Sequence, residues 1–333
     1  MIKRIPKFVI TVVAACAISA CAIAPLDKNY QRPALDVPAT LVSSGTAINV
    51  DWLVWWKGFN APVLNDLLNE AAVNSQDLAL ATARIAEVRA MLDQNASNFY
   101  PTVDLNASAS RKRTSENANG YSAAAGSYSN DRQLGLSASY EIDFWGKYAR
   151  ADEATKARLL AQTASRGTVL TTLYANVAQS YFALRALDSQ LTLAERTLAT
   201  RSENLRLQNR RFSAGVIGEI DLRQAESEAA STDATLQLTR QNRNNAEAAL
   251  AVLLGRKPSA IANPVLARGA DVAALYVAQT IPAELPSDVL TRRPDVVAAE
   301  QSLIAANADI GQARAAYFPR VSLTEVLVCS RKG

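Results

Sequence analysis

The pattern between Pro101 and Asp143 alternates between apolar and polar residues along two arms joined by a polar loop. The apolar positions are Val103, Leu105, Ala107 and Ala109 in the first arm, and Leu134, Leu136, Ala138, Tyr140 and Ile142 in the second. A period of two gives each strand one apolar and one polar face. Residues 101–146 therefore predict a strand hairpin, with Arg111–Asn130 as its connecting loop. A soluble sheet and the wall of a transmembrane barrel both fit this pattern.

The pattern becomes helical after Gly146. Residues 147–212 contain no proline and a single glycine, Gly167, which predicts about 100 Å of helix at 1.5 Å per residue. An apolar stripe at three- and four-residue spacing indicates a coiled-coil partner, and its members are Val169, Leu173, Val177, Tyr181, Leu184 and Leu191. We interpret this stripe as packing and not as a ligand site.

A turn with two glycines, Gly215 and Gly218, interrupts the helical pattern at 213–220. A second helix follows to Leu254, about half as long as the first, so 147–254 forms a long helical hairpin. We further expect a helix over 61–100, a loop region over 255–285 and a helix over 286–316. The second helix of the hairpin and the helix over 286–316 would lie end to end beside the long one, with the loop region between them.

An internal repeat links the two ends of the chain. Asp295 lies 218 positions after Asp77, and the same offset relates Ala81 to Ala299, Gln94 to Gln312 and Pro101 to Pro319. Each copy is a helix that leads through two aromatic residues and a proline into a strand. Proline ends the helix, and the aromatic residues suit a membrane interface. The repeat predicts a duplicated architecture.

The second copy begins a strand at 317–333, but the repeat is lost after Thr324, where the chain reads EVLVCSRKG. A barrel strand needs about 9–11 residues. We therefore expect a third strand that is barely completed and has no partner here.

The N-terminus has the features of an export signal. Residues 1–20 combine a basic start with an apolar run from Phe8 to Ile18, too short to span a membrane as a helix. The ending Ile18-Ser19-Ala20-Cys21 resembles the lipobox of bacterial lipoproteins, which predicts lipidation at Cys21.

Two alternatives to lipidation at Cys21 stay open. Cys16 also ends a matching motif, but it would leave only about eight apolar residues after Lys7, few for a signal core. Alternatively, both cysteines only fill the apolar run. Ala22 follows Cys21, and by resemblance to Gram-negative lipoproteins it favours the outer membrane. Residues 21–60 would form a lipidated N-terminal arm.

Charge and residue chemistry argue against catalysis. Three of the 35 Lys and Arg residues lie in the signal, which leaves 32 against 31 acidic residues and so no basic surplus for nucleic acid. The chain has no histidine, and its three cysteines are too far apart for a metal cluster. We find no phosphate loop and no nucleophile motif. The sequence predicts a protein that is not an enzyme and has no cofactor or metal.

A series of motifs resembles the outer membrane factor family, the TolC-like channels of tripartite efflux pumps, and especially its lipidated multidrug-efflux branch. The resemblance runs to about Leu323 and rests on the order and spacing of the motifs. They are Asn29-Tyr30-Gln31-Arg32-Pro33, Trp55-Trp56 with Phe59, Asp77-Leu78 with Ala83-Arg84, Phe99-Tyr100-Pro101, Tyr140 to Gly146, Arg211-Phe212 with Ala214-Gly215 and Ile220-Asp221, and Arg293-Pro294-Asp295.

The resemblance implies an α+β membrane protein with TolC-like architecture. Three protomers share one twelve-stranded outer-membrane barrel, and their helices form a periplasmic tunnel about 100 Å long. Solutes leave through this conduit, driven by an inner-membrane transporter that is reached through a periplasmic adaptor. Residues 61–316 would hold the first repeat and the first helix of the second. The second hairpin and the second long helix pair of the family are absent, so the resemblance implies a truncated copy that does not form a normal channel by itself.

The resemblance also assigns roles to particular residues. The polar side chains expected to face the barrel lumen are Asp104, Asn106, Ser108, Glu141 and Asp143. The hairpin tip expected to contact the adaptor comprises Gly215, Val216, Ile217 and Gly218, although both glycines could simply shape the turn. The competing interpretations are a periplasmic adaptor with its own coiled-coil hairpin and a structural lipoprotein without a conduit.

Overall fold

The structure, a computed structural model, describes residues 30–33, 52–115, 117, 128–262, 266–270 and 291–332. It divides into two compact units. The first contains the described residues within 1–35, 85–162 and 298–333, and the second contains those within 36–84 and 163–297. Cys21 and the signal segment lie outside the described residues.

The described elements are mostly helices. They are η1 (Trp52–Phe59), α2 (Pro62–Asn74), α3 (Gln76–Ser97), β1 (Thr102–Arg113), β2 (Tyr128–Ile142), α4 (Lys147–Ser213), α5 (Glu219–Leu253), α6 (Pro258–Ala262), α8 (Pro294–Ala315) and β3 (Val321–Lys332). Helix α4 is 67 residues long, about 100 Å at 1.5 Å per residue, as the uninterrupted pattern predicts.

The single helix expected over 61–100 is wrong, because Ser75 divides it into α2 and α3. Ser75 has extended backbone angles, φ −63° and ψ 124°, and its Oγ accepts a hydrogen bond from the Leu78 N–H at 3.4 Å. Serine favours this position because its hydroxyl satisfies a free N–H at a helix start. The helix expected over 286–316 is described as α8 from Pro294, preceded by helical residues 291–292.

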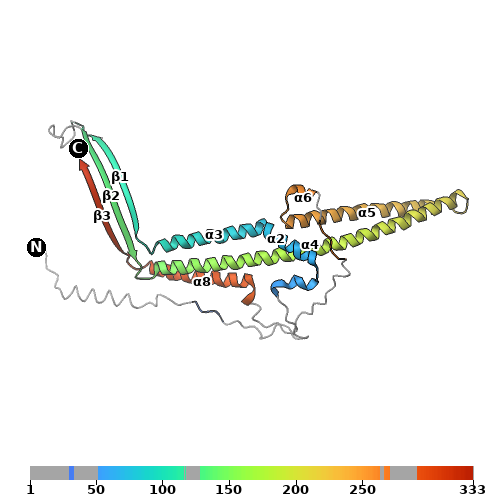
Figure 1. Ribbon diagram of the computed structural model, residues 1–333, viewed down its shortest axis with the longest axis horizontal. Helices are drawn as coiled ribbons and strands as arrows, with labels where there is room; N and C mark the ends of the chain where they lie inside the picture. Colours follow the sequence, from blue (N-terminus) through green and yellow to red (C-terminus); the bar gives the residue numbers. More distant parts are fainter. Residues whose placement is uncertain are drawn as a thin grey trace. The chain divides into compact units, whose positions relative to one another are not determined.

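The first unit contains one antiparallel sheet in the order β1-β2-β3 (Figure 1). The expectation that the third strand has no partner is wrong, since β3 pairs with β2 from Val321 opposite Ile142 to Lys332 opposite Asp131. Pairing between β1 and β2 extends to Arg113 opposite Tyr128. The connecting loop is therefore shorter than the expected Arg111–Asn130.

The two repeat copies have the same local structure. At the end of α3 the Tyr100 N–H donates to the Ser97 carbonyl at 3.0 Å, and at the end of α8 the Phe318 N–H donates to the Ala315 carbonyl at 3.2 Å. Each turn then leads through proline into a strand, β1 or β3. This agrees with the helix-proline-strand repeat predicted from the sequence.

Helix α8 lies beside the N-terminal part of α4 in the first unit. Arg158 on α4 is ion-paired with Asp309 on α8, and a Cβ at Gly311 would lie 3.2 Å from the Arg150 side chain. Both helices carry buried alanines: Ala151, Ala154, Ala157 and Ala161 on α4, and Ala305, Ala308 and Ala315 on α8. Small side chains allow helix axes to approach closely.

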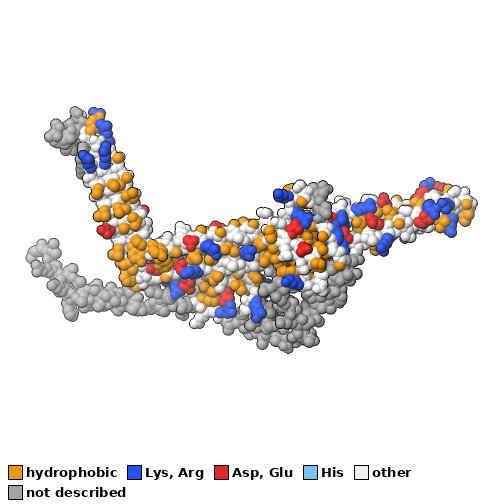
Figure 2. All heavy atoms as spheres, viewed as in Figure 1, with side chains coloured by type: hydrophobic (Ala, Val, Ile, Leu, Met, Phe, Trp, Pro, Cys, Tyr) orange, Lys and Arg blue, Asp and Glu red, His pale blue; other side chains and the backbone are white. Residues whose placement is uncertain are grey.

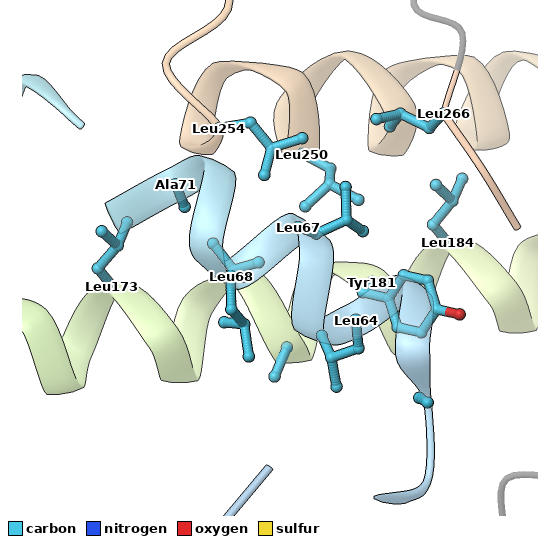
Figure 3. Close-up of a cluster of buried hydrophobic side chains, with 13 residues drawn as sticks. Leu64, Leu67, Leu68, Ala71, Leu173, Tyr181, Leu184, Leu250, Leu254 and Leu266 are labelled. Carbon is cyan, nitrogen blue, oxygen red and sulfur yellow. The ribbon is translucent and has the colours of Figure 1, made fainter. Parts of the chain in front are cut away.

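The hydrophobic core of the second unit lies where α2 packs among α4, α5 and the segment at Leu266 (Figure 3). Leu64, Leu250 and Leu254 are fully buried, and Tyr181 is 1% exposed. A fully buried leucine contributes about 1.5–3 kcal/mol. Aromatic rings of η1 extend this core, since the Trp56 and Tyr174 ring centroids are 4.6 Å apart and those of Phe59 and Phe182 are 4.9 Å apart.

The helical hairpin expected over 147–254 is formed by α4 and α5, and the two helices lie side by side beyond the core (Figure 1). Exposed ion pairs cross between them, such as Arg201 to Glu228 at 2.9 Å and Arg240 to Glu195 at 3.1 Å. Exposed pairs of this kind typically contribute less than about 1 kcal/mol. Their main effect is to fix the register of α5 on α4.

Candidate conduit wall and docking tip

The register of the sheet places four of the five predicted lumen residues on one face, namely Asp104, Asn106, Ser108 and Glu141. Residues directly opposite each other in a ladder point to the same side of the sheet. Asp104 lies opposite Ser137, Asn106 opposite Gly135 and Ser108 opposite Gln133. On the next ladder, Glu141 lies opposite Ser322. This polar face includes Asp104, Asn106, Ser108, Gln133, Ser137, Ser139, Glu141, Ser322 and Thr324.

Glu141 and Asp143 contact the start of α4. The Glu141 carboxylate lies 3.5 Å from Lys147 Nζ, and burial together with a hydrogen bond to Glu141 raises the pKa of the Tyr148 hydroxyl. Asp143 lies one residue beyond β2, and its Oδ2 accepts hydrogen bonds from the N–H groups of Tyr148 at 3.0 Å and Ala149 at 2.9 Å. Asp143 therefore caps α4 and joins the strand to the helix.

The opposite face of the sheet is apolar and exposed. Leu105 is 70% exposed, Leu323 60% and Leu327 61%. The apolar residues on this face are Val103, Leu105, Ala107, Ala109, Leu134, Leu136, Ala138, Tyr140, Ile142, Val321, Leu323, Leu327 and Cys329. A contiguous exposed apolar surface of this kind indicates contact with lipid or with another protein.

Strand β3 departs from the alternation after Thr324, where the repeat is lost. Glu325 lies opposite Ala138 on the apolar face, whereas Val326 and Val328 lie on the polar face opposite Ser137 and Gly135. From Glu325 onward, β3 therefore no longer has polar residues on one face and apolar residues on the other. The two-faced character of the sheet is therefore clearest in β1, β2 and the first residues of β3.

The joint between sheet and helices contains an aromatic contact that the sequence did not predict. The rings of Trp145 and Phe318 stack with centroids 4.6 Å apart, and Trp145 Nε1 donates a hydrogen bond to the Pro319 carbonyl at 3.0 Å. Tyr100 and Tyr317 are 71% and 89% exposed. Exposed aromatic residues at one end of an apolar strand set are typical of a membrane interface.

The predicted tip is a helix end followed by a helix start. Gly215 has φ +71°, its N–H donates to the Phe212 carbonyl at 2.9 Å, and the Val216 N–H donates to the Arg211 carbonyl at 2.9 Å. These two bonds form a Schellman motif, which requires the left-handed conformation that glycine tolerates. The turn therefore accounts for Gly215.

Gly218 is different, because the turn does not require glycine there. It is the N-cap of α5 with φ −82° and ψ 165°, and a Cβ on it would meet nothing within 4 Å. Around it, Val216 is 71% exposed, Ile220 83% and Phe212 40%, whereas Ile217 is half-buried. The tip thus presents apolar side chains and open space beside Gly218.

A cluster of five buried or half-buried charged residues, here called the charge cluster, was missed by the sequence analysis. Arg268 Nε lies 2.9 Å from Asp188 and its Nη2 lies 2.8 Å from Glu247, and Arg243 lies 3.3 Å from Asp188 and 3.1 Å from Glu247. Arg185, the fifth member, pairs with Asp188 at 3.1 Å. These residues are distant in sequence, so spacing alone gave no signal.

The charge cluster fixes the segment 266–270 to the base of the helical hairpin. Arg185 Nη2 donates to the Ala270 carbonyl at 2.9 Å, and the Tyr181 hydroxyl donates to the Arg268 carbonyl at 2.8 Å. Desolvation raises the pKa of the Tyr181 hydroxyl. The cluster serves attachment of the chain, and its charges are mutually paired.

None of the helices in the described ranges combines the length and apolar character needed to cross a membrane. Within the same ranges, no three His, Cys, Asp or Glu side chains gather in a way that could hold a metal ion.

Comparison with known proteins agrees with this architecture. The family model of the outer membrane efflux protein matches residues 67–256 and 285–327. The chain is 35% identical over 325 residues to the pyoverdine export outer membrane protein OpmQ of Pseudomonas aeruginosa, covering 96% of this chain and 67% of OpmQ. It is 33% identical to the cation efflux system protein CusC of Escherichia coli K12, covering 93% of this chain and 66% of CusC.

Solved structures show the same fold. The outer membrane channel CmeC of Campylobacter jejuni superposes with a TM-score of 0.80 at 25% identity, over 93% of this chain and 70% of CmeC. The open-state MtrE channel of Neisseria gonorrhoeae superposes with a TM-score of 0.73 at 28% identity, over 92% and 71%. The chain spans about two-thirds of the length of the curated relatives it matches. Its sequence and its TolC-like α+β fold show that it belongs to the outer membrane efflux protein family.

Proposed function

We propose that this chain is an outer-membrane channel subunit of a tripartite efflux pump, a passive conduit for drugs and other small solutes. The observation that carries the proposal is the sheet register, which puts Asp104, Asn106 and Ser108 on one face and Val103, Leu105 and Ala107 on the other. A strand with lipid on one side and a wet lumen on the other needs this division.

In this proposal the polar face lines the lumen of a barrel shared by three protomers. Asp104 and Glu141 give that wall negative charge, and the serines and Asn106 supply hydroxyl and amide groups that water can solvate. These side chains do not identify which solute the conduit would carry. The named relatives differ in theirs, with pyoverdine for OpmQ and cations for CusC.

The hairpin tip is the proposed contact with a periplasmic adaptor, which connects the conduit to an inner-membrane transporter. Support comes from the exposed apolar side chains Val216 and Ile220 and from the open space beside Gly218. Exposed apolar groups at a loop between charged helix ends are typical of a protein contact. Gly218 would let the adaptor backbone approach closely.

The proposed membrane attachment includes a lipid on Cys21 and an arm that follows it. Support for the arm comes from Arg32, which is ion-paired with Glu300 on α8. The hydrogen bond from Arg32 lowers the pKa of the Glu300 carboxyl. Acyl chains contribute about 0.8 kcal/mol per buried methylene, so several chains hold a protein firmly on a leaflet.

Membrane fractionation combined with heat-modifiable gel mobility tests the proposal. A barrel subunit should remain in the outer-membrane fraction after carbonate extraction and should migrate differently before and after boiling. A periplasmic adaptor or a peripheral lipoprotein would show a single mobility at both temperatures, and that result would contradict the conduit.

The adaptor contact is tested separately by crosslinking the tip to an adaptor in cells with Gly218→Ser. Serine is a good N-cap and would leave α5 intact or slightly more stable. We expect at least a fivefold loss of crosslinked product, because the new side chain fills the space beside the tip. Ala230→Ser, on the exposed surface of α5 away from the tip, is the matched control and should leave the yield unchanged. An unchanged yield in Gly218→Ser would contradict contact at this residue.

A further inference from the structure

Four arginines lie on the apolar face of the sheet at the end farthest from the helices. Arg111 lies opposite Asn130, and Arg113 opposite Tyr128, in line with Val103, Leu105 and Ala107 on β1. Arg132 on β2 lies opposite Ala109 on β1 and opposite Arg331 on β3. Arg132 is in line with Leu134 on β2, and Arg331 is in line with Leu327 on β3. We call Arg111, Arg113, Arg132 and Arg331 the arginine belt. Figure 2 shows Lys and Arg side chains gathered at this end of the sheet.

The arginine belt lies about one membrane thickness from the other end of the apolar face. Arg132 lies ten positions from Ile142 along β2, and Arg331 lies ten positions from Val321 along β3. At about 3.4 Å per residue and a tilt of about 40°, this is a height of about 26 Å. The lipid-facing band of an outer-membrane barrel is about 25 Å tall. The belt therefore falls at the level of lipid headgroups.

A shallow hollow of about 260 Å³ lies between the belt and the apolar band. Its lining includes Ala107, Leu134 and Cys329, which occupy one row of the apolar face, and Arg132 and Arg331 in the next row. Gln133 and Ser330 complete it. The hollow thus has an apolar floor and two guanidinium groups at its edge.

The charges of the belt are not neutralised by described residues. Like charges directly opposite each other in a ladder, as at Arg132 and Arg331, are destabilising. Within the described part of the chain, none of the four is ion-paired with a carboxylate, and the one acidic residue on this face, Glu325, lies six residues from Arg331. Asp131 is on the polar face, opposite Ser110.

The belt does have aromatic support. The Arg111 and Arg113 guanidinium carbons lie 4.8 Å and 5.6 Å from the centroid of the Tyr128 ring, which is 50% exposed. A tyrosine between cations at the end of an apolar band suits a membrane interface, where its ring is apolar and its hydroxyl is wet. This contact holds two arginines at a fixed height on the sheet.

We infer that the arginine belt binds the phosphate groups of an anionic glycolipid in the outer leaflet of the membrane. This inference rests on the proposed function, which places the apolar face against lipid. Guanidinium groups bind phosphate through paired hydrogen bonds, and a phosphate between Arg132 and Arg331 would offset their repulsion. The acyl chains would lie over the apolar floor formed by Ala107, Leu134 and Cys329.

The test measures lipid binding to the purified full chain in neutral detergent by native mass spectrometry. The probes are bisphosphorylated lipid A and a phosphate-free analogue. The variant is Arg111→Gln/Arg113→Gln/Arg132→Gln/Arg331→Gln, and the matched control is Lys112→Gln, which removes a charge at the same height on the polar face. We expect the belt variant to lose at least tenfold in affinity for lipid A and the control to change less than twofold.

Further arms identify the source of the phosphate and guard against misfolding. Inorganic phosphate in molar excess should not displace lipid A, because it lacks the acyl contribution. Displacement would overturn a lipid site in favour of a free-phosphate site. If the fourfold variant does not fold, Arg132→Gln and Arg331→Gln alone should each weaken binding about threefold, and unchanged affinity in both would overturn the inference.

Failure of the inference can be told apart from failure of the proposed function. A belt variant that reaches the outer membrane, shows normal heat-modifiable mobility and binds lipid A as tightly as the parent contradicts the arginine belt alone. Equal losses in the belt variant and in Lys112→Gln also contradict it, since they indicate non-specific charge attraction. A parent chain found outside the outer membrane contradicts the proposed function itself.

Discussion

Replacing Glu247 with glutamine tests whether the charge cluster holds the base of the helical hairpin together. Its carboxylate is 5% exposed and pairs with Arg268 at 2.8 Å and with Arg243 at 3.1 Å. Glutamine keeps the shape of the side chain and removes its charge. The three arginines would then face Asp188 alone, and the cluster would gain one unit of positive charge.

The magnitude follows from the burial of the partners. Removing one member of a fully buried ion pair costs about 3–5 kcal/mol, because a charge remains without its partner. Here Arg243 and Arg268 are 30% and 22% exposed, and Arg268 keeps Asp188 at 2.9 Å. Water and the remaining carboxylate reduce the cost to about 2 kcal/mol. At about 2–4 °C per kcal/mol, the Tm falls by roughly 4–8 °C.

Thermal unfolding followed by circular dichroism in detergent measures this change, and limited trypsin digestion locates it. Release of 266–270 should speed cleavage after Arg268, where trypsin cuts. Glu228→Gln is the matched control, because Glu228 pairs with Arg201 at 2.9 Å but is 39% exposed, and it should lower the Tm by no more than about 2 °C. Equal Tm values for the two variants, with unchanged cleavage after Arg268, would refute a stabilising role for the cluster.

Three further predictions concern single contacts. Gly255→Ala should destabilise the chain by about 3 kcal/mol, since φ at this residue is +69° and the new Cβ would lie 2.3 Å from the Asn74 carbonyl oxygen. Thermal unfolding measures this change, and a loss below about 1 kcal/mol would contradict the geometry. Tyr181→Phe should cost about 1 kcal/mol in the same assay, because the Arg268 carbonyl would lose the hydrogen bond that the Tyr181 hydroxyl donates at 2.8 Å. An unchanged Tm would argue against that bond. The attachment of the arm by Arg32 should depend on pH, because the hydrogen bond from Arg32 lowers the pKa of the Glu300 carboxyl in the folded chain. The stabilisation by this ion pair is therefore fully present above the ordinary glutamate pKa of about 4.3 and is lost as the pH falls through the lowered pKa of the folded chain. After correction for the intrinsic exchange rate, which itself slows in acid, the hydrogen-exchange protection of residues 30–32 should therefore fall in acid. Arg32→Ala should show the same loss of protection at neutral pH, and equal protection in parent and variant at neutral pH would contradict the attachment.

The long helices could be predicted from the sequence because few residues can end a helix. Without proline between 147 and 212, the pattern predicted α4 to within a residue of its observed end at Ser213. The break at Ser75 was missed because α2 and α3 share one helical pattern across it. Its signal was present, since Asn74 and Ser75 are both residues that cap helix starts.

The parts of the candidate site that depend on alternation along a strand could be predicted from the sequence. The parts that depend on tertiary contacts could not. Alternation placed Asp104 and Glu141 on the polar faces of their own strands, and the register brings those two faces to one side of the sheet. It could not show that Asp143 caps α4, because capping depends on the angle at which helix follows strand. The roles of Gly215 and Gly218 likewise separated only once their backbone angles were known.

The most direct test of the account is the accessibility of spin labels along β1 in the membrane-embedded chain. Single cysteines would be introduced at successive positions from Val103 to Ser108 in a Cys329→Ser background, and collisions with oxygen and with a water-soluble nickel chelate would be compared. We predict a period of two, with labels at 103, 105 and 107 more accessible to oxygen in lipid and labels at 104, 106 and 108 more accessible to nickel in water. Uniform accessibility to nickel along the strand would contradict a lipid-facing wall.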